Sequence, residues 1–164
     1  MSHPLFTSKI LEPQALRLQL ENIKSLGSVV FTNGVFDVIH KGHVSYLDQA
    51  RQMGDVLIVA LNTDRSARLL GKGQDRPLNT LVDRAHVIAA LESVSYVTWF
   101  DESTPIDIIK LIRPDLIVKG GDYDMSTLDE TKFVESYGGK AAAIQFLSGY
   151  STTALVQKIH EGKG

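Results

Sequence analysis

Short apolar runs alternate with segments of helical periodicity along almost the whole chain. The run Val29-Val30-Phe31-Thr32 is rich in β-branched residues, and a helical pattern follows it and stops at Gly54. Extended along the chain, this pattern predicts strands at 29–32, 56–61, 96–100, 116–119 and 143–147, with helices at 12–26, 42–53, 81–92, 105–112, 128–137 and 152–160. Residues 65–79 are expected to form a polar loop. The expected helix caps are Asn79 or Thr80, Ser103 or Thr104, and a hydroxyl among residues 151–153.

Strands that alternate with helices, without a strong hairpin dipeptide between them, favour a parallel sheet covered on both faces. We therefore predict an α/β fold, a doubly wound (Rossmann-like) domain with a five-stranded parallel sheet. The chain has 164 residues, close to the roughly 150 typical of one domain. A single domain is expected, with residues 1–27 as an N-terminal leader and helix and residues 28–161 as the core.

Composition removes several classes of function. The chain has no cysteine, which excludes a disulfide framework, a thiolate zinc site and a cysteine nucleophile. The net charge is −2 and no long basic run is present, so no nucleic-acid partner is expected. Neither a signal peptide nor an apolar stretch of the ~20 residues that span a bilayer is found. We expect a cytoplasmic protein with no membrane partner.

Polar residues collect directly after the predicted strands, where the ligands of such sheets bind. Solvated loops would also be polar there, but the clusters contain amides, carboxylates, cations and hydroxyls in specific groups. The clusters are Thr32 to Asp37, which includes Asn33, Gly34 and Phe36; Asn62 to Asp64; Asp101 and Glu102; Lys119 to Asp122, which includes Gly120 and Gly121; and Ser148 to Thr153, which includes Ser151 and Thr152.

Two histidines three residues apart, His40 and His43, stand at the start of a predicted helix with Gly42 between them. The free N–H groups and partial positive charge of a helix N-terminus, together with two imidazoles, favour phosphate oxygens. The same spacing is compatible with a metal. That alternative needs a third ligand, and although Asp37 is nearby, no open zinc triad is recognisable. We predict no protein-bound metal.

The cations Lys72, Arg76 and Arg84 follow the second predicted strand. No Walker loop is present, and no G-x-G-x-x-G follows the first strand, which disfavours a P-loop kinase or an ordinary dehydrogenase. Lys72 and Arg76 nevertheless lie in a glycine-bearing loop, which suits either a solvated loop or one that folds over a polyphosphate. Arg84 occupies the first turn of a helix, where a cation is unfavourable unless an anion compensates it.

The segment Gly34-Val35-Phe36-Asp37-Val38-Ile39-His40-Lys41-Gly42-His43 closely resembles the G-x-F-D-x-x-H-x-G-H signature of the cytidylyltransferase-like nucleotidyltransferases. Tyr150-Ser151-Thr152-Thr153 resembles the second motif of that superfamily. The resemblance covers about residues 26–161. Phe31-Thr32-Asn33-Gly34 and the segment from Arg113 to Tyr123 resemble the heptose 1-phosphate adenylyltransferase branch.

The resemblance implies a role for each matching residue. His40, His43, Lys72 and Arg84 would act on the phosphates as catalytic residues. The nucleotide would contact Thr32, Asn33, Gly34, Phe36, Gly42, Asp122, Ser151, Thr152 and Thr153. The acceptor substrate would contact Asp37, Asp64, Lys119, Gly120 and Gly121, with Lys119 on its phosphate, because related glycerol phosphate cytidylyltransferases tend to have a neutral residue there.

The expected reaction is AMP transfer from ATP to D-glycero-β-D-manno-heptose 1-phosphate, with ADP-heptose and pyrophosphate as products. The sugar phosphate is already an anion and attacks the α-phosphate directly, so positioning and charge neutralisation suffice. Mg²⁺ carried with ATP is the expected cofactor, and a homodimer is implied. The alternatives are a CTP-dependent cytidylyltransferase acting on glycerol 3-phosphate or a similar polyol phosphate, and a nucleotide-binding regulatory module without turnover.

Overall fold

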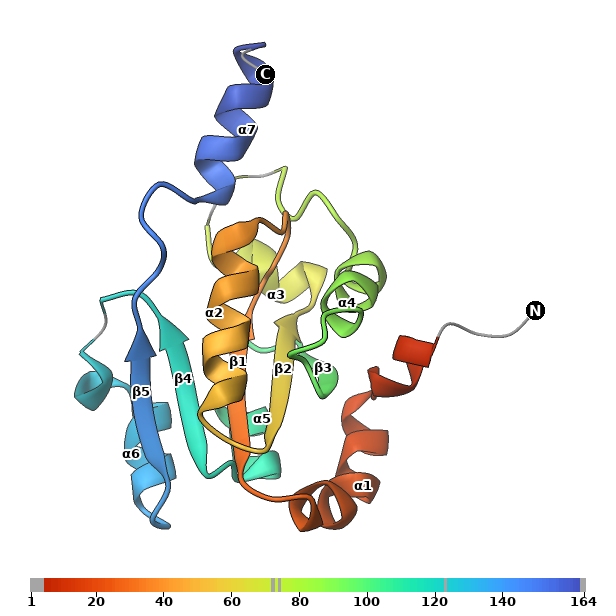
Figure 1. The fold of residues 1–164 in the computed structure, drawn as a ribbon, viewed down its shortest axis with the longest axis vertical. Helices are drawn as coiled ribbons and strands as arrows, with labels where there is room; N and C mark the ends of the chain where they lie inside the picture. The colour runs from red at the N-terminus through yellow and green to blue at the C-terminus, as the bar shows by residue number, and fades with distance from the viewer. Residues whose placement is uncertain (1–4, 72, 74, 123, 163–164) are drawn as a thin grey trace.

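The chain folds around one five-stranded sheet. The computed structural model describes residues 5–71, 73, 75–122 and 124–162. All strand pairs are parallel, and the order is β3-β2-β1-β4-β5 (Figure 1). The strands are β1 Val29–Gly34, β2 Val56–Asn62, β3 Tyr96–Phe100, β4 Leu116–Gly120 and β5 Lys140–Ile144. This arrangement confirms the predicted doubly wound α/β fold.

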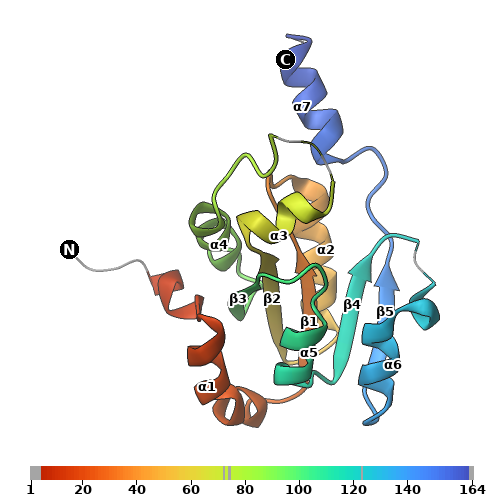
Figure 2. The same ribbon diagram turned by 180° about the vertical axis from the view of Figure 1, so that it is seen from behind.

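Helices cover both faces of the sheet. α2 lies on one face and α5 and α6 on the other, as the two opposite views show (Figures 1 and 2). The helices are η1 Leu5–Lys9, α1 Pro13–Ser25, α2 Lys41–Gln52, α3 Asp64–Leu69, α4 Leu81–Ala89, α5 Ile106–Ile112, η2 Met125–Thr127, α6 Asp129–Glu135 and α7 Thr152–His160. Within the residues described, no helix combines the length and apolarity needed to cross a bilayer.

Side-chain alternation along the strands divides the core into two clusters. Val30 packs with α2 and α4, whereas Val29 and Phe31 pack with α1, α5 and α6. Successive side chains of a strand point to opposite faces, so every central strand contributes to both clusters. This explains why the strands are continuously apolar instead of alternating with polar residues.

Three local predictions need correction. The helix α3, Asp64–Leu69, overlaps the start of the expected polar loop. It is capped by Thr63, whose side chain accepts a hydrogen bond from the Ser66 amide. β5 begins at Lys140 instead of residue 143, because Lys140 and the alanines that follow it pair with β4. The apolar pattern did not predict a strand at these first residues. The start of α5 has no side-chain cap, so the expected cap at Ser103 or Thr104 is wrong. The Thr80 and Ser151 caps are confirmed.

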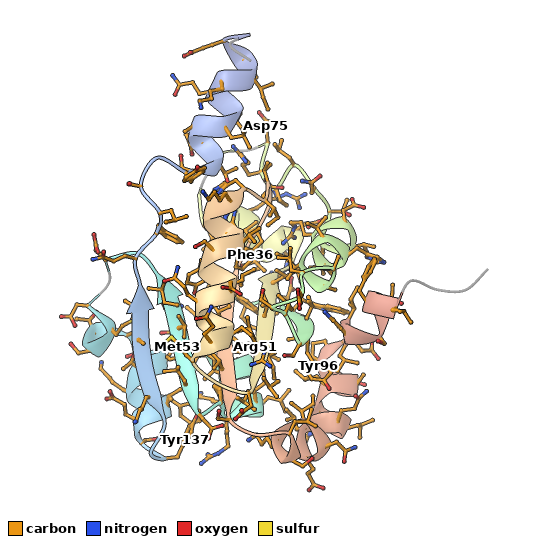
Figure 3. All side chains as sticks on the ribbon, viewed as in Figure 1. Phe36, Arg51, Met53, Asp75, Tyr96 and Tyr137 are labelled. Carbon is orange, nitrogen blue, oxygen red and sulfur yellow. The ribbon has the colours of Figure 1, made fainter. Side chains whose placement is uncertain are left out.

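The carboxyl ends of all five strands meet at one edge of the sheet. Figure 3 places Phe36, which follows β1, toward this edge and Tyr137 at the opposite end of the molecule. The segments that follow β1, β4 and β5 carry most of the predicted site residues, and they leave the sheet at this edge. The fold therefore gathers residues that are far apart in the sequence.

A buried cation ties this edge together. The Arg84 guanidinium is inaccessible to solvent, and it donates to the carbonyl oxygens of Val35 and Asn62 at 2.8 Å each and of Asn79 at 3.1 Å. Its Nη2 also pairs with Asp64 Oδ1 at 2.7 Å. Arg84 thus joins the loop after β1, the end of β2, the start of α3 and the segment before α4.

We predict that Arg84→Met lowers the free energy of unfolding by about 3–5 kcal/mol, because it leaves a carboxylate and buried carbonyls without their partner. Urea denaturation of both proteins measures the change. Arg68→Met is the matched control, because Arg68 lies on the exposed surface of α3. Equal destabilisation by the two substitutions would contradict the role assigned to Arg84.

Candidate active site

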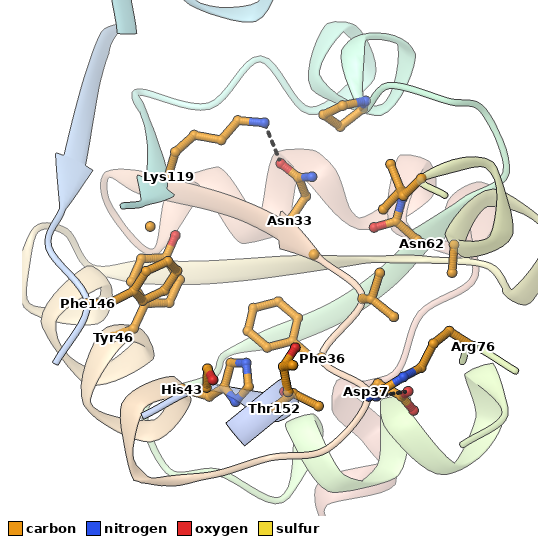
Figure 4. A pocket seen from close by; sticks show the side chains of 18 of the residues that line it. Asn33, Phe36, Asp37, His43, Tyr46, Asn62, Arg76, Lys119, Phe146 and Thr152 are labelled. Carbon is orange, nitrogen blue, oxygen red and sulfur yellow. Dashed lines mark hydrogen bonds and ion pairs between the residues drawn. The ribbon is translucent and has the colours of Figure 1, made fainter. Parts of the chain in front are cut away.

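A cavity of about 890 Å³ opens at the carboxyl edge of the sheet (Figure 4). Most of the residues expected to bind a ligand line it. They are Asn33, Gly34, Phe36, Asp37, His40, His43, Lys119, Gly120, Ser151, Thr152 and Thr153. The cavity therefore joins the ends of β1 and β4 to the starts of α2 and α7.

His40 and His43 form the start of α2 as a reciprocal cap. Nδ1 of His40 accepts from the Gly42 amide at 3.1 Å, and Nδ1 of His43 accepts from the His40 amide at 3.3 Å. A nitrogen that accepts a hydrogen bond carries no proton, so each neutral ring carries its proton on Nε2. Both rings line the cavity and are fixed as Nε2–H donors.

The histidine rings lie against each other, with centroids 3.9 Å apart. Burial lowers the pKa of His40. Burial and then the neighbouring His40 lower the pKa of His43 to about 4. Near neutral pH both rings are thus uncharged in the free protein.

Asp37 fixes the loop that precedes α4. Its carboxylate accepts from the Leu78 and Asn79 amides at 2.8 Å each and pairs with Arg76 at 3.2 Å. Burial raises the pKa of Asp37, but these amides and the Arg76 guanidinium outweigh burial and hold the pKa below its usual value. Asp37 lines the cavity, but its hydrogen bonds go to the protein. Its structural role is to hold Arg76 at the cavity wall.

Lys119 ends β4 and is largely buried. Its Nζ donates to Asn33 Oδ1 at 3.1 Å and pairs with Glu130 Oε1 at 3.6 Å. Burial lowers the pKa of Lys119, and the Glu130 carboxylate opposes this change. Glu130 comes from α6 and also lines the cavity. The sequence did not indicate Glu130, because a carboxylate in a helix is usually solvent-exposed.

Three hydroxyl-bearing residues at the start of α7, Ser151, Thr152 and Thr153, line the cavity. Ser151 Oγ accepts from the Ala154 amide at 3.0 Å and caps the helix. Thr152 Oγ1 donates to the Val38 carbonyl at 3.2 Å, which joins α7 to the loop before the histidines. The first turns of α2 and α7 therefore border the same cavity.

Several expected site residues lie elsewhere. Thr32 is buried in the core, where its hydroxyl is 2.6 Å from the Tyr46 hydroxyl. Gly42 lies behind the His40 ring and supplies the amide that fixes it. Gly121 and Asp122 border a smaller hollow beside Gln145 and Phe146. None of these four lines the main cavity.

Arg84 and Asp64, also expected at the site, contact protein groups in this structure. They bind each other, and the Arg84 guanidinium is enclosed by carbonyls instead of facing a phosphate. The unfavourable position of Arg84 in a helix first turn is compensated by protein oxygens and not by a ligand. Lys72, expected to close over the phosphates, lies outside the described residues.

Several cavity residues were not assigned to the site from the sequence, including Tyr46 on α2, Ala67 on α3 and Phe100 at the end of β3. Glu130 lies on α6, Phe146 follows β5, and Ser103 and Thr104 precede α5. Asn62 was recognised as one of the polar residues that follow the predicted strands, because it stands directly after an apolar run. Phe146 carries no such signal, because an apolar residue after an apolar strand is indistinguishable from the core.

Comparisons with known proteins find similar sequences along almost the whole chain. Residues 31–158 match the cytidylyltransferase-like family. D-beta-D-heptose 1-phosphate adenylyltransferase of Bordetella bronchiseptica is 56% identical over 162 residues, which cover 99% of this chain and 100% of that protein. Bifunctional protein HldE of Hahella chejuensis is 47% identical over 149 residues, which cover 90% of this chain and 31% of that protein.

Two solved structures are similar. The lipopolysaccharide core biosynthesis protein of Thermoplasma volcanium GSS1 has a TM-score of 0.62 and 26% identity, with 76% of this chain and 99% of that chain covered. Pantoate-beta-alanine ligase of Francisella tularensis has a TM-score of 0.60 and 14% identity, with coverages of 93% and 77%, and supports the fold alone. On the family match and the full-length relative, the chain belongs to the cytidylyltransferase-like family.

Proposed function

We propose that this protein transfers AMP from ATP to D-glycero-β-D-manno-heptose 1-phosphate and releases ADP-heptose and pyrophosphate. The observation that carries the proposal is the histidine pair at the start of α2, in a chain 56% identical along its whole length to an enzyme named for this activity. The chain spans about a third of the length of the bifunctional relatives, so only this transfer is proposed for it.

The chemistry requires no covalent intermediate. An oxygen of the acceptor phosphate attacks the α-phosphorus of ATP, the bond from that phosphorus to the bridging oxygen breaks, and pyrophosphate leaves with the electron pair. The acceptor is already ionised at neutral pH, so no strong general base is needed. Catalysis then consists of aligning two anions and stabilising the charge that develops between them.

We assign the triphosphate to the side of the cavity bordered by α2 and α7. The Nε2–H groups of His40 and His43 donate to its oxygens, and the partial positive charge at the N-termini of α2 and α7 favours the same anion. Neutral imidazoles suit this role, because the backbone amides that donate to each Nδ1 leave Nε2–H as the donor available to the phosphate oxygens.

Mg²⁺ is proposed to arrive on the ATP phosphates. Among the described residues, no group of three histidine, cysteine or carboxylate side chains is arranged to hold a metal ion. Mg²⁺ keeps several waters and binds readily through substrate phosphates, so the donor set suits a metal carried by the nucleotide. Bound there, the ion would neutralise charge on the phosphate oxygens.

We also propose that the protein acts as a homodimer. α7 has no buried residue, projects beyond the body of the molecule in both views, and leaves Ile159 70% exposed. A second copy would cover this helix, whose first turn borders the cavity, and would stabilise the hydroxyls of Ser151 and Thr152 there.

A substrate panel tests the reaction. Purified protein with Mg²⁺ is given ATP or CTP together with the heptose 1-phosphate, glycerol 3-phosphate or phosphopantetheine, and pyrophosphate release is measured. We expect release only from ATP with the heptose phosphate, because a polar site rejects acceptors that leave its groups unpaired. Efficient release from CTP with glycerol 3-phosphate would overturn the substrate assignment, and no release from any pair would favour a regulatory module.

His40→Ala and His43→Ala are each expected to lower kcat about a hundredfold or more with a smaller change in KM for ATP, since each removes a donor to the developing charge. Steady-state kinetics measures both constants. His86→Ala on the exposed side of α4 is the control. Unchanged kcat in either active-site variant would remove the histidines from the mechanism.

Lys119→Met is expected to raise KM for the sugar phosphate more than KM for ATP, because Lys119 is assigned to the acceptor phosphate. Lys132→Met, at an exposed position of α6, is the matched control. The two KM values are measured with the other substrate at saturation. A larger rise for ATP would place Lys119 on the nucleotide instead.

A further inference from the structure

The side chains at the carboxyl ends of the central strands point to two sides of the sheet. Asn33, Asn62 and Lys119 have the same alternation as Phe31, Ala60 and Ile117, which belong to the core cluster packed under α1, α5 and α6. The three polar side chains therefore extend toward the α5 and α6 face. Glu130 of α6 joins them through its ion pair with Lys119.

Asn33, Asn62, Lys119 and Glu130 are called the polar row below. Figure 4 shows Lys119, Asn33 and Asn62 on one side of the cavity and His43 and Thr152 on the other. All four members of the row line the same cavity as the histidines. A ligand that reaches both sides thus crosses the ends of β1 and β4.

The polar row has hydrogen-bonding capacity that the protein does not use. Glu130 is 8% exposed, and Lys119 at 3.6 Å is its one polar side-chain partner among the described residues. Within the same described part of the chain, the Asn62 side-chain amide donates to Ser66 Oγ at 2.9 Å, and its side-chain oxygen has no partner. Because Glu130 and Asn62 line the cavity, their remaining acceptor capacity is available to a polar ligand there.

We propose that the polar row binds the hydroxyl groups of the acceptor sugar and that Glu130 is a specificity-determining residue. This inference rests on the proposed function and assigns the sugar to the α5 and α6 side. A carboxylate accepts hydrogen bonds from hydroxyl groups, whereas it repels phosphate oxygens. The Lys119 ammonium offsets the charge of Glu130 and leaves a donor for the acceptor phosphate.

The division of charge supports the sugar over the triphosphate as occupant. The histidine side presents imidazoles and helix N-termini, which attract anions, while the polar row presents one carboxylate, one ammonium and two amides. Such a neutral, mixed set of donors and acceptors is complementary to hydroxyl groups. The acceptor phosphate then lies between the row and the histidines, next to the α-phosphate.

The test compares Glu130→Gln and Asn62→Ser with the unaltered protein in the pyrophosphate-release assay. Each variant is expected to raise KM for the heptose 1-phosphate by roughly tenfold to a hundredfold. The Glu130 variant loses a hydrogen bond to a charged group, and the Asn62 variant is expected at the lower end of this range. KM for ATP should change less than about threefold. Glu135→Gln, exposed on the same helix, is the control and should leave both constants unchanged.

Three outcomes would overturn the inference. An unaltered protein without turnover of the heptose phosphate rejects the proposed function itself. If that activity is established, unchanged KM values in both variants would show that the polar row binds no ligand. A rise in KM for ATP as large as the rise for the sugar phosphate would instead place the row on the ATP ribose. Thermal unfolding checks each variant, and if Glu130→Gln does not fold, Asn62→Ser decides.

Discussion

The position of the Arg84 guanidinium determines the geometry on which the rest of the site depends. A cation in the first turn of a helix opposes the helix dipole, and burial adds a desolvation cost that only surrounding oxygens can offset. Three carbonyls and Asp64 supply those oxygens. Because the Val35 carbonyl is one of them, the backbone is fixed just before Phe36, which adopts a φ of 50° and turns the chain toward the histidines.

The same network continues to the cavity wall. Asn79, whose carbonyl accepts from Arg84, donates its own amide to Asp37. Asp37 in turn holds Arg76 beside the cavity. The histidine loop and the loop before α4 are therefore fixed relative to each other without any ligand. Preorganised donors of this kind lose little free energy to rearrangement when substrate binds. A reaction in which the protein supplies neither nucleophile nor strong base gains its rate from such donors.

The sequence predicted what depends on local pattern and missed what depends on tertiary contacts. Continuous apolar runs located β1 to β4 within two residues, and the histidine motif identified the start of α2. The predictions that differ from the structure concern residues whose contacts depend on burial. Thr32 and Asn33 are adjacent polar residues with different surroundings. The Thr32 hydroxyl enters the core on the α2 side, whereas the Asn33 side chain reaches the cavity. Arg84 was recognised as unusual, but whether a ligand or the protein compensates it depends on segments distant in sequence.

Two glycines allow aromatic rings to pack against the ends of β1 and β4. β1 ends at Gly34 and its neighbour β4 ends at Gly120. A Cβ at Gly34 would lie 2.9 Å from the Phe36 ring, and one at Gly120 would lie 2.3 Å from the Phe146 ring. Each strand end is thus covered by an aromatic ring where a side chain would stand. Without Cβ atoms at these positions, the Phe36 and Phe146 rings pack directly against the two strand ends and border the cavity that the polar row shares with His40 and His43.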